Sequence, residues 1–317
     1  MIGITLKHMR YFLALATHRH FGRAADACAI SQPALSLQIK ELETMLGGPL
    51  VERSARSFNL TPLGEEFLAR AKDILIRVND LEELVRSSKD TLSGRLRLGI
   101  IPTVAPYLLP EIITALGDRY PDLELQPRES VTQSLVDSLL SSRLDVAIVA
   151  LPISEPSVSE FALFDEEFLL VRPSRDAGKP VPSPKSLKAM RLLLLEEGHC
   201  FRDQALSFCD ISDAKPGHIM EGSSLSTLVQ MVSAGIGATL IPEMALGFET
   251  RSADVCIARF NAPPPKRTIG MIWRKASPLA DALMTVGAII RKTAEEKDRA
   301  RTLVPSAEVL QRAAAGH

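Results

Sequence analysis

The first sixty residues alternate apolar and polar side chains at the spacing of helices with one buried face. Residues 6–17 carry apolar side chains every three or four positions, and residues 22–29 fit a second, shorter helix. Ser31 can cap a third helix, Pro33 is tolerated in its first turn, and Gly47-Gly48 can end it. The inner stripe of this helix is Leu35, Ile39, Leu42 and Leu46. This arrangement predicts a helix-turn-helix.

A helix-turn-helix places the start of its last helix in the major groove of DNA. Residues 50–60 carry Arg53 and Arg56 between two short strand-like pieces, as in a wing whose arginines meet phosphates or a minor groove. Residues 1–60 contain seven Lys and Arg residues and four Asp and Glu residues, a local excess of three positive charges. A plain helical bundle with a solvated surface fits the same pattern and leaves Gln32 and Ser36 without a special role.

A long amphipathic helix is predicted next. Thr61 can cap it, Pro62 can begin it, and apolar residues then alternate by four and three positions, which is a coiled-coil seam of nearly three heptads. A single narrow seam favours pairing of two subunits, although it can also pack on the protein's own core. Its members are Phe67, Ala71, Ile74, Val78, Leu81 and Val85.

From residue 95 onward, short apolar runs alternate with helical patterns. Such alternation predicts an α/β fold with parallel sheets covered by helices. The chain has 317 residues, 46% of them hydrophobic, which is enough for two or three domains. The strand candidates are residues 96–100, 123–126, 146–149, 168–171, 192–195 and 239–241.

Composition narrows the class of protein. Four cysteines do not make a disulfide framework, and the first residues lack the apolar core of a signal peptide, so a reducing cytoplasm is expected. The apolar runs are shorter than the roughly 20 residues that span a bilayer, so no membrane partner is expected.

Cys200 is the candidate reactive residue. It falls where a buried strand, residues 192–195, ends and a helix begins, and this is where open α/β sheets hold ligands. The helix N-terminus and nearby His and Arg side chains favour a thiolate there. If residues 201–209 are helical, the Cα atoms of Cys200 and Cys209 lie about 13 Å apart, whereas a disulfide needs less than about 7 Å. A bond between them would therefore unwind the helix, as a switch does.

Two other interpretations of the cysteines stay open at this point. Free cysteines are most often small buried hydrophobic residues, and the spacing of Cys200 and Cys209 matches no standard redox or metal motif. A zinc site from His199, Cys200, Cys209 and Cys256 is weaker still, because neither a paired-cysteine motif nor a spaced pair of histidines is present. We expect no metal and no cofactor.

The N-terminal motifs identify a family. Residues 21–26 (FGRAAD), 30–43 (ISQPALSLQIKELE) and 60–64 (LTPLG) resemble the winged helix-turn-helix of LysR-type transcriptional regulators. The resemblance implies that Gln32, Pro33 and Ser36 approach the bases of a double-stranded DNA operator, with Arg53 and Arg56 on its backbone. It also implies a linker helix that pairs subunits into a homodimer or homotetramer, and contact with RNA polymerase.

The same resemblance implies a domain plan. Residues 1–60 would form the winged helix-turn-helix and 61–90 the linker helix. Residues 91–301 would form a two-lobed α/β effector domain similar to periplasmic binding proteins. Lobe I would comprise 91–166 and 269–301, lobe II would comprise 167–268, and a tail would follow at 302–317.

Three further segments, residues 101–110, 198–209 and 267–270, resemble the peroxide-sensing regulators within this family. The resemblance implies a regulator, not an enzyme. Cys200 would be oxidised by hydrogen peroxide and Cys209 would resolve it to a disulfide, which a cellular dithiol would reduce. The side chains around the peroxide would be Thr103, Thr132, His199, Gln204 and Arg267.

Each of these residues also has a simpler interpretation. Thr103 and Thr132 can cap helices, and Arg267 can pair with an acid. A LysR-type regulator with structural cysteines and a small organic ligand between its lobes remains the main alternative.

Overall fold

The computed structural model describes residues 3–53, 58–87, 92–187, 190–208, 219–261 and 263–303. Its contacts divide the chain into two compact units, Met1–Val85 and Arg86–His317. None of the helices among these residues is both long and apolar enough to cross a bilayer.

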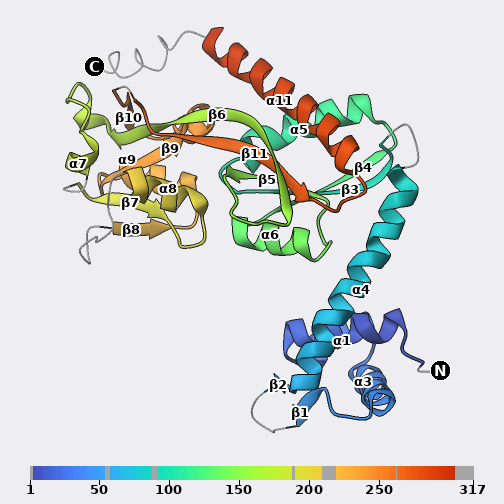
Figure 1. Cartoon of the computed structure of the whole chain (residues 1–317). Helices are drawn as coiled ribbons and strands as arrows, with labels where there is room; N and C mark the ends of the chain where they lie inside the picture. The colour runs from blue at the N-terminus through green and yellow to red at the C-terminus, as the bar shows by residue number, and fades with distance from the viewer. Residues whose placement is uncertain are drawn as a thin grey trace. The chain divides into compact units, whose positions relative to one another are not determined.

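The first unit contains the three predicted helices, α1 (Leu6–His18), α2 (Phe21–Ala27) and α3 (Gln32–Leu46) (Figure 1). The Ser31 hydroxyl accepts a hydrogen bond from the Ala34 amide, so it caps α3 as predicted. Gly47 ends that helix in the left-handed conformation, at φ 74°. The three helices pack around an apolar core that includes Phe12, Leu15, Ala24, Leu35 and Leu42.

A two-stranded wing follows, in which β1 (Val51–Arg53) pairs antiparallel with β2 (Phe58–Leu60). Helix α4 (Pro62–Ser87) begins directly after it. The Thr61 hydroxyl accepts a 3.0 Å hydrogen bond from the Gly64 amide, as a cap residue does. The lower part of α4 belongs to the core of this unit, since the rings of Phe67 and Phe12 lie 5.5 Å apart.

The second unit is built on one mixed sheet, and all six predicted strands are present in it. Its order is β4-β3-β5-β11-β6-β9-β7-β8, with β10 beside β6. The strands are β3 (Gly94–Ile100), β4 (Leu123–Glu129), β5 (Val146–Leu151), β6 (Val158–Pro173), β7 (Leu192–Leu195), β8 (Ile219–Gly222), β9 (Ala238–Pro242), β10 (Val255–Arg259) and β11 (Lys266–Arg274).

The predicted parallel strands are present, and they belong to a mixed sheet. Strands β3, β4 and β5 run parallel to one another, and β7 runs parallel to β8 and β9. Strands β6 and β11 pair antiparallel with each other, and they also pair antiparallel with β9 and β5 respectively. These two long strands carry the chain between the two parallel groups and back, so they run against their neighbours (Figure 1).

Helices cover the sheet on both sides. Helix α6 packs on β5, α9 packs on β6, β7 and β9, and α8 packs on β7, while α11 lies along α5 and β6 (Figure 1). The helices of this unit are α5 (Ala105–Arg119), α6 (Thr132–Leu140), α7 (Pro184–Leu187), α8 (Cys200–Phe208), α9 (Leu225–Ser233), α10 (Leu246–Glu249) and α11 (Ala280–Leu303).

Candidate functional site

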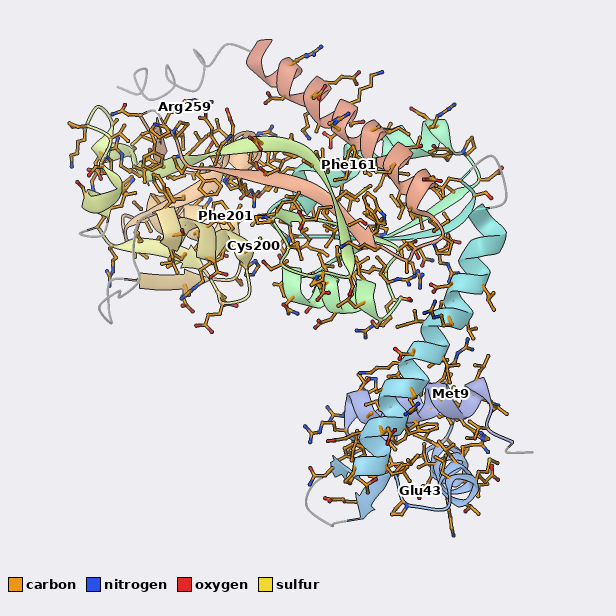
Figure 2. The ribbon with its side chains drawn as sticks, viewed as in Figure 1. Met9, Glu43, Phe161, Cys200, Phe201 and Arg259 are labelled. Carbon is orange, nitrogen blue, oxygen red and sulfur yellow. The ribbon has the colours of Figure 1, made fainter. Side chains whose placement is uncertain are left out.

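Cys200 is the first residue of α8, as the sequence predicts. The buried strand β7 ends at Leu195, and Gly198 makes the turn at φ 95°, a backbone conformation that glycine adopts at no steric cost. The thiol is half-buried, and Figure 2 shows it beside Phe201 in the middle of the second unit. Unpaired amides of the first helical turn favour negative charge here.

The Cys200 side chain faces a small pocket. One wall is formed by Thr103 and Thr132, from the segments that begin α5 and α6, and the other by His199 and Phe201. The unfilled space is about 170 Å³. It has no room for the centre of a water-sized sphere, so a small molecule enters only with a shift of the lining side chains. The remaining lining residues are Ile101, Pro102 and Val131.

Arg267 lies beside this pocket and is fully buried. Its Nη1 donates to Thr103 Oγ1 at 2.8 Å, and its Nη2 donates to the Thr103 carbonyl at 3.1 Å. The other edge of the guanidinium binds Glu166, and its face lies 5.2 Å from the ring centroid of Phe201. Arg267 therefore both pairs with an acid and contacts Thr103, another of the residues predicted to surround the peroxide.

Thr132 and Gln204 have buried polar atoms without a hydrogen-bond partner among the described residues. These atoms are Thr132 Oγ1 and Gln204 Oε1. Thr132 is the first residue of α6, and that helix has no side-chain cap, so the capping interpretation of Thr132 is wrong. Buried polar groups are nearly always paired in native proteins. An unpaired hydroxyl that lines the Cys200 pocket thus marks a place for a polar ligand or a water molecule.

The two cationic side chains next to Cys200 differ from the sequence-based expectation. Burial lowers the pKa of His199 below its ordinary value, against the opposing effect of Glu196 and Glu129, so its imidazole is neutral at pH 7. Arg202 donates to Glu221 at 2.6 Å and to the Leu195 carbonyl at 3.0 Å, which ties α8 to the ends of β8 and β7. The neutral His199 therefore lacks the positive charge that the sequence-based expectation gave it.

Cys209 lies outside the described residues. Helix α8 is described from Cys200 to Phe208, and the Cα atoms of these two residues are about 12 Å apart. The helix predicted after Cys200 is therefore present up to residue 208, and the separation of the two cysteines stays a prediction.

The other cysteines have structural surroundings. Cys28 caps the end of α2, and burial raises the pKa of its thiol. Cys256 on β10 donates from Sγ to the Pro173 carbonyl at 3.3 Å. Within the described part of the chain, no group of three His, Cys, Asp or Glu residues is arranged to hold a metal ion.

The residues predicted to read DNA lie on the outer face of α3. Gln32, Pro33 and Ser36 are exposed, whereas Leu35 and Ile39 of the same helix face the core. Arg53 is the last residue of β1, with a side chain outside the description, and Arg56 lies outside the described residues.

The predicted seam of α4 divides into two parts. Phe67 contacts Phe12, and Ala71 is buried, so this end of the seam is covered by the chain itself. Ile74 is 42% exposed and Leu81 is 63% exposed, and Val78 between them is half-buried. The side chain of Val85 is outside the description. The part of the seam from Ile74 to Leu81, called the upper seam below, thus presents large apolar side chains to the outside of the first unit.

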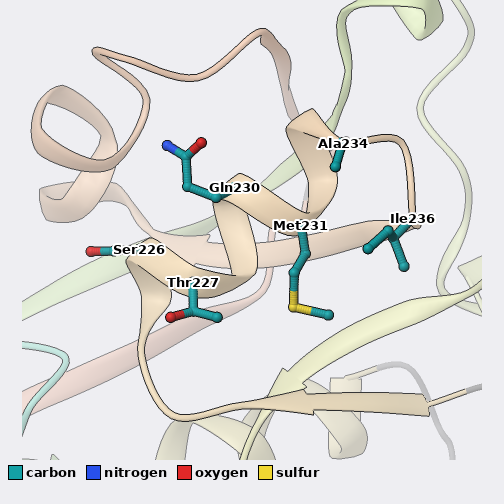
Figure 3. A pocket seen from close by; sticks show the side chains of 6 residues that line it. All are labelled: Ser226, Thr227, Gln230, Met231, Ala234 and Ile236. Carbon is teal, nitrogen blue, oxygen red and sulfur yellow. The ribbon is translucent and has the colours of Figure 1, made fainter.

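A second hollow lies on α9, and Figure 3 shows its side chains along that helix and the loop after it. It has no acidic, basic or cysteine side chain, so it offers no redox or acid-base chemistry. Its lining residues are Ser226, Thr227, Gln230, Met231, Ala234 and Ile236.

Glu166 and Phe201 were not predicted as site residues from the sequence. Glu166 stands in an acidic run with Asp165 and Glu167, and only the two-residue period of a strand separates the inward side chain from its outward neighbours. Phe201 packs against Phe168 with ring centroids 4.8 Å apart, and the Arg267 guanidinium lies 5.2 Å from its ring centroid. Neither contact is local in sequence.

Comparisons with known proteins agree with this architecture. Residues 6–65 match the model "Bacterial regulatory helix-turn-helix protein, lysR family", and residues 89–295 match the "LysR substrate binding domain". A probable hydrogen peroxide-inducible genes activator from Streptomyces viridosporus is 43% identical over 292 residues, which covers 91% of this chain and 94% of the relative.

Solved structures give the same assignment. A full-length OxyR variant from Pseudomonas aeruginosa superposes with a TM-score of 0.69 at 37% identity, covering 91% of this chain and 95% of that one. A cysteine-to-serine variant of OxyR from Corynebacterium glutamicum, solved with hydrogen peroxide bound, gives 0.63 at 36% identity over 92% of this chain and 93% of that one. The chain therefore belongs to the LysR-type transcriptional regulators, within the OxyR group, and is a DNA-binding regulator, not an enzyme.

Proposed function

We propose that this regulator senses hydrogen peroxide through oxidation of Cys200 and a disulfide to Cys209, and that the resulting rearrangement alters its action on DNA. The observation that carries the proposal is the pocket in which the Cys200 thiol meets two threonine hydroxyls, one bound by Arg267 and one without a partner. The OxyR from Corynebacterium glutamicum, whose variant was solved with hydrogen peroxide bound, supports the same ligand here.

The first chemical step is a displacement at oxygen. The Cys200 thiolate attacks one oxygen of the peroxide, the O–O bond breaks, and the departing hydroxide takes up a proton to leave as water. Sulfur loses two electrons and becomes a sulfenic acid, while the peroxide is reduced. Negative charge grows on the departing oxygen, so donors aimed at that oxygen lower the barrier.

Thr103 is suited to be such a donor. Its oxygen already accepts from Arg267, so its own hydrogen is free to point elsewhere, and the residue lines the pocket. Thr132 also lines the pocket, and Gln204 lies one helical turn beyond Cys200. These side chains would hold the second oxygen or a water molecule.

The second step forms the disulfide. The Cys209 thiol attacks the sulfenic sulfur, water leaves, and the S–S bond closes. If the helix continues to Cys209 as the sequence predicts, the two Cα atoms are about 13 Å apart. This exceeds the roughly 7 Å that a disulfide allows, so the helix must unwind. Unwinding moves Phe201 away from Phe168 on β6 and Arg267 on β11, the strands that connect the two halves of the sheet. A cellular dithiol would reverse the bond.

The first unit would carry the response to DNA. We expect Gln32, Pro33 and Ser36 to meet the operator, with Arg53 and Arg56 on its backbone and the α4 seam pairing two subunits. A change in how the effector domains associate would then shift the paired helix-turn-helices and their contact with RNA polymerase.

A small organic effector is the less supported alternative. The space beside Cys200 does not admit even a water-sized sphere without a shift of its walls. A small organic effector would need a larger shift than hydrogen peroxide, so the space favours the smaller molecule.

The test combines thiol mass spectrometry with DNA footprinting on the same samples, before and after stoichiometric hydrogen peroxide. We expect one Cys200–Cys209 bond per chain and an altered footprint. The variant Cys200→Ser should lose both, and Cys256→Ser, which removes a cysteine packed on β6, should keep both. A footprint that changes with peroxide equally in Cys200→Ser would refute the proposal.

A further inference from the structure

Adjacent acids on β6 have opposite surroundings. Glu166 is 7% exposed and binds Arg267, whereas Glu167 is directed to the surface and pairs with Arg259 at 3.1 Å. Both acids therefore have a cationic partner, but only the Glu166 pair is buried. A buried ion pair adds little stability over apolar residues of the same size, so stability alone does not account for it.

Glu166 fixes the plane of the guanidinium. Its Oε2 accepts from Nε of Arg267 at 3.2 Å and from Nη2 at 3.0 Å. The opposite edge then reaches both the hydroxyl and the carbonyl of Thr103, and one face rests on the Phe201 ring. Four hydrogen bonds and a ring contact thus hold a planar group whose geometry is rigid.

This arrangement decides which way the Thr103 hydroxyl points. Oγ1 accepts from Nη1, and Arg267 has no acceptor to receive a hydrogen in return. The hydroxyl hydrogen is left for the pocket that Thr103 shares with Cys200. Without Glu166, the buried cation would lose the two hydrogen bonds that fix its plane and would no longer be held on Thr103.

We propose that Glu166 is a positioning residue for the peroxide reaction: it holds Arg267 on Thr103 so that the threonine hydroxyl donates into the Cys200 pocket. The proposal rests on the peroxide-sensing function proposed above. Glu166 itself touches neither sulfur nor peroxide in this scheme, and it acts through Arg267 and Thr103.

The two consequences of removing the charge have opposite signs. In Glu166→Gln the amide keeps the size of the side chain, but a buried negative charge is gone, which favours the thiolate of Cys200. Alkylation of Cys200 by iodoacetamide should then reach its half-maximal rate at a lower pH. The rate constant with hydrogen peroxide should nevertheless fall, by about tenfold or more, because the donor is no longer aligned. A purely structural role would shift both rates in one direction or neither.

The experiment measures both rate constants against pH on the full-length chain, with Cys200 oxidation and alkylation followed by mass spectrometry. Glu167→Gln is the matched control and should behave as the unmodified chain. Glu166→Asp keeps the charge, so its alkylation profile should stay in place while its peroxide rate falls. This variant keeps the test decisive if Glu166→Gln does not fold, as judged by fluorescence of the buried Trp273.

The outcomes separate the two proposals. If the unmodified chain fails to react at Cys200 with stoichiometric peroxide, the proposed function is wrong. If the unmodified chain reacts and Glu166→Gln reacts at the same or a higher rate with peroxide, only the role of Glu166 is wrong.

Discussion

At the residue scale, the site depends on how a few polar atoms are shared. Arg267 donates hydrogen bonds to both Glu166 and Thr103. Arg202, in the first turn of α8, donates to Glu221. His199, the histidine next to the thiol, is left neutral by burial. Neither His199, which is neutral, nor Arg202, which is paired with Glu221, therefore supplies an unpaired positive charge beside Cys200.

The lowered pKa of His199 predicts a pH dependence of stability. The unfolded chain takes up a proton on this histidine as the pH falls through about 6.5, whereas the folded chain resists it because burial disfavours the charged form. The folded chain should therefore lose stability below that pH. In His199→Asn this part of the loss should vanish, so the melting temperature should fall less between pH 7 and pH 5.5. Equal falls in both chains would contradict the assignment.

At the element scale, the strands predicted best were those whose side chains are buried. Strand β7 was predicted with its observed bounds because both its faces are covered, which leaves an unbroken apolar run. The first half of β6 was missed, since its partly exposed residues mix charges with apolar side chains. Strand direction is not written in periodicity, so the antiparallel course of β6 and β11 was not foreseen. Thr103, Thr132 and Arg267 are far apart in sequence, and only family resemblance brought them together.

In the proposed mechanism the disulfide unwinds helix α8, so the intrinsic stability of this helix should set how readily the disulfide forms. Ser207 is exposed within it, which allows a change of helix propensity without repacking. Alanine and glycine differ by about 1 kcal/mol in a helix, or roughly fivefold in an equilibrium constant. Ser207→Ala should therefore favour the dithiol about fivefold over Ser207→Gly in a thiol-disulfide titration. The first oxidation of Cys200 should proceed at the same rate in both, which is the internal control.

At the scale of the whole molecule, two features connect distant parts of the sequence. Within the second unit, Tyr107 on α5 donates to Glu249 on α10, which also accepts from Ser226 at 2.6 Å. Lys297 on α11 binds the Tyr107 carbonyl and Glu111. Burial and the Glu249 carboxylate raise the pKa of Tyr107, so this phenol stays protonated and keeps donating. These contacts hold α5, α9, α10 and α11 together.

The second feature is the exposed upper seam of α4, which predicts self-association. Leu81→Glu places a charge on a surface that would be buried between two subunits. Because an unpaired charge is costly to bury, we expect this variant to weaken the dimer at least tenfold. Asn79→Glu adds the same charge two residues away, off the seam, and should leave association unchanged. Sedimentation velocity across a concentration series measures both. Unchanged sedimentation of Leu81→Glu would show that the seam does not pair subunits.

The narrowness of the space beside Cys200 bears on which oxidants reach the thiol. Because the gap opens only when its lining side chains move, access to the sulfur should depend on the size of the oxidant. If Cys200 reacts with hydrogen peroxide as proposed, a bulky hydroperoxide would have to displace Val131 and Phe201 further than hydrogen peroxide does, so its rate constant with Cys200 should be lower.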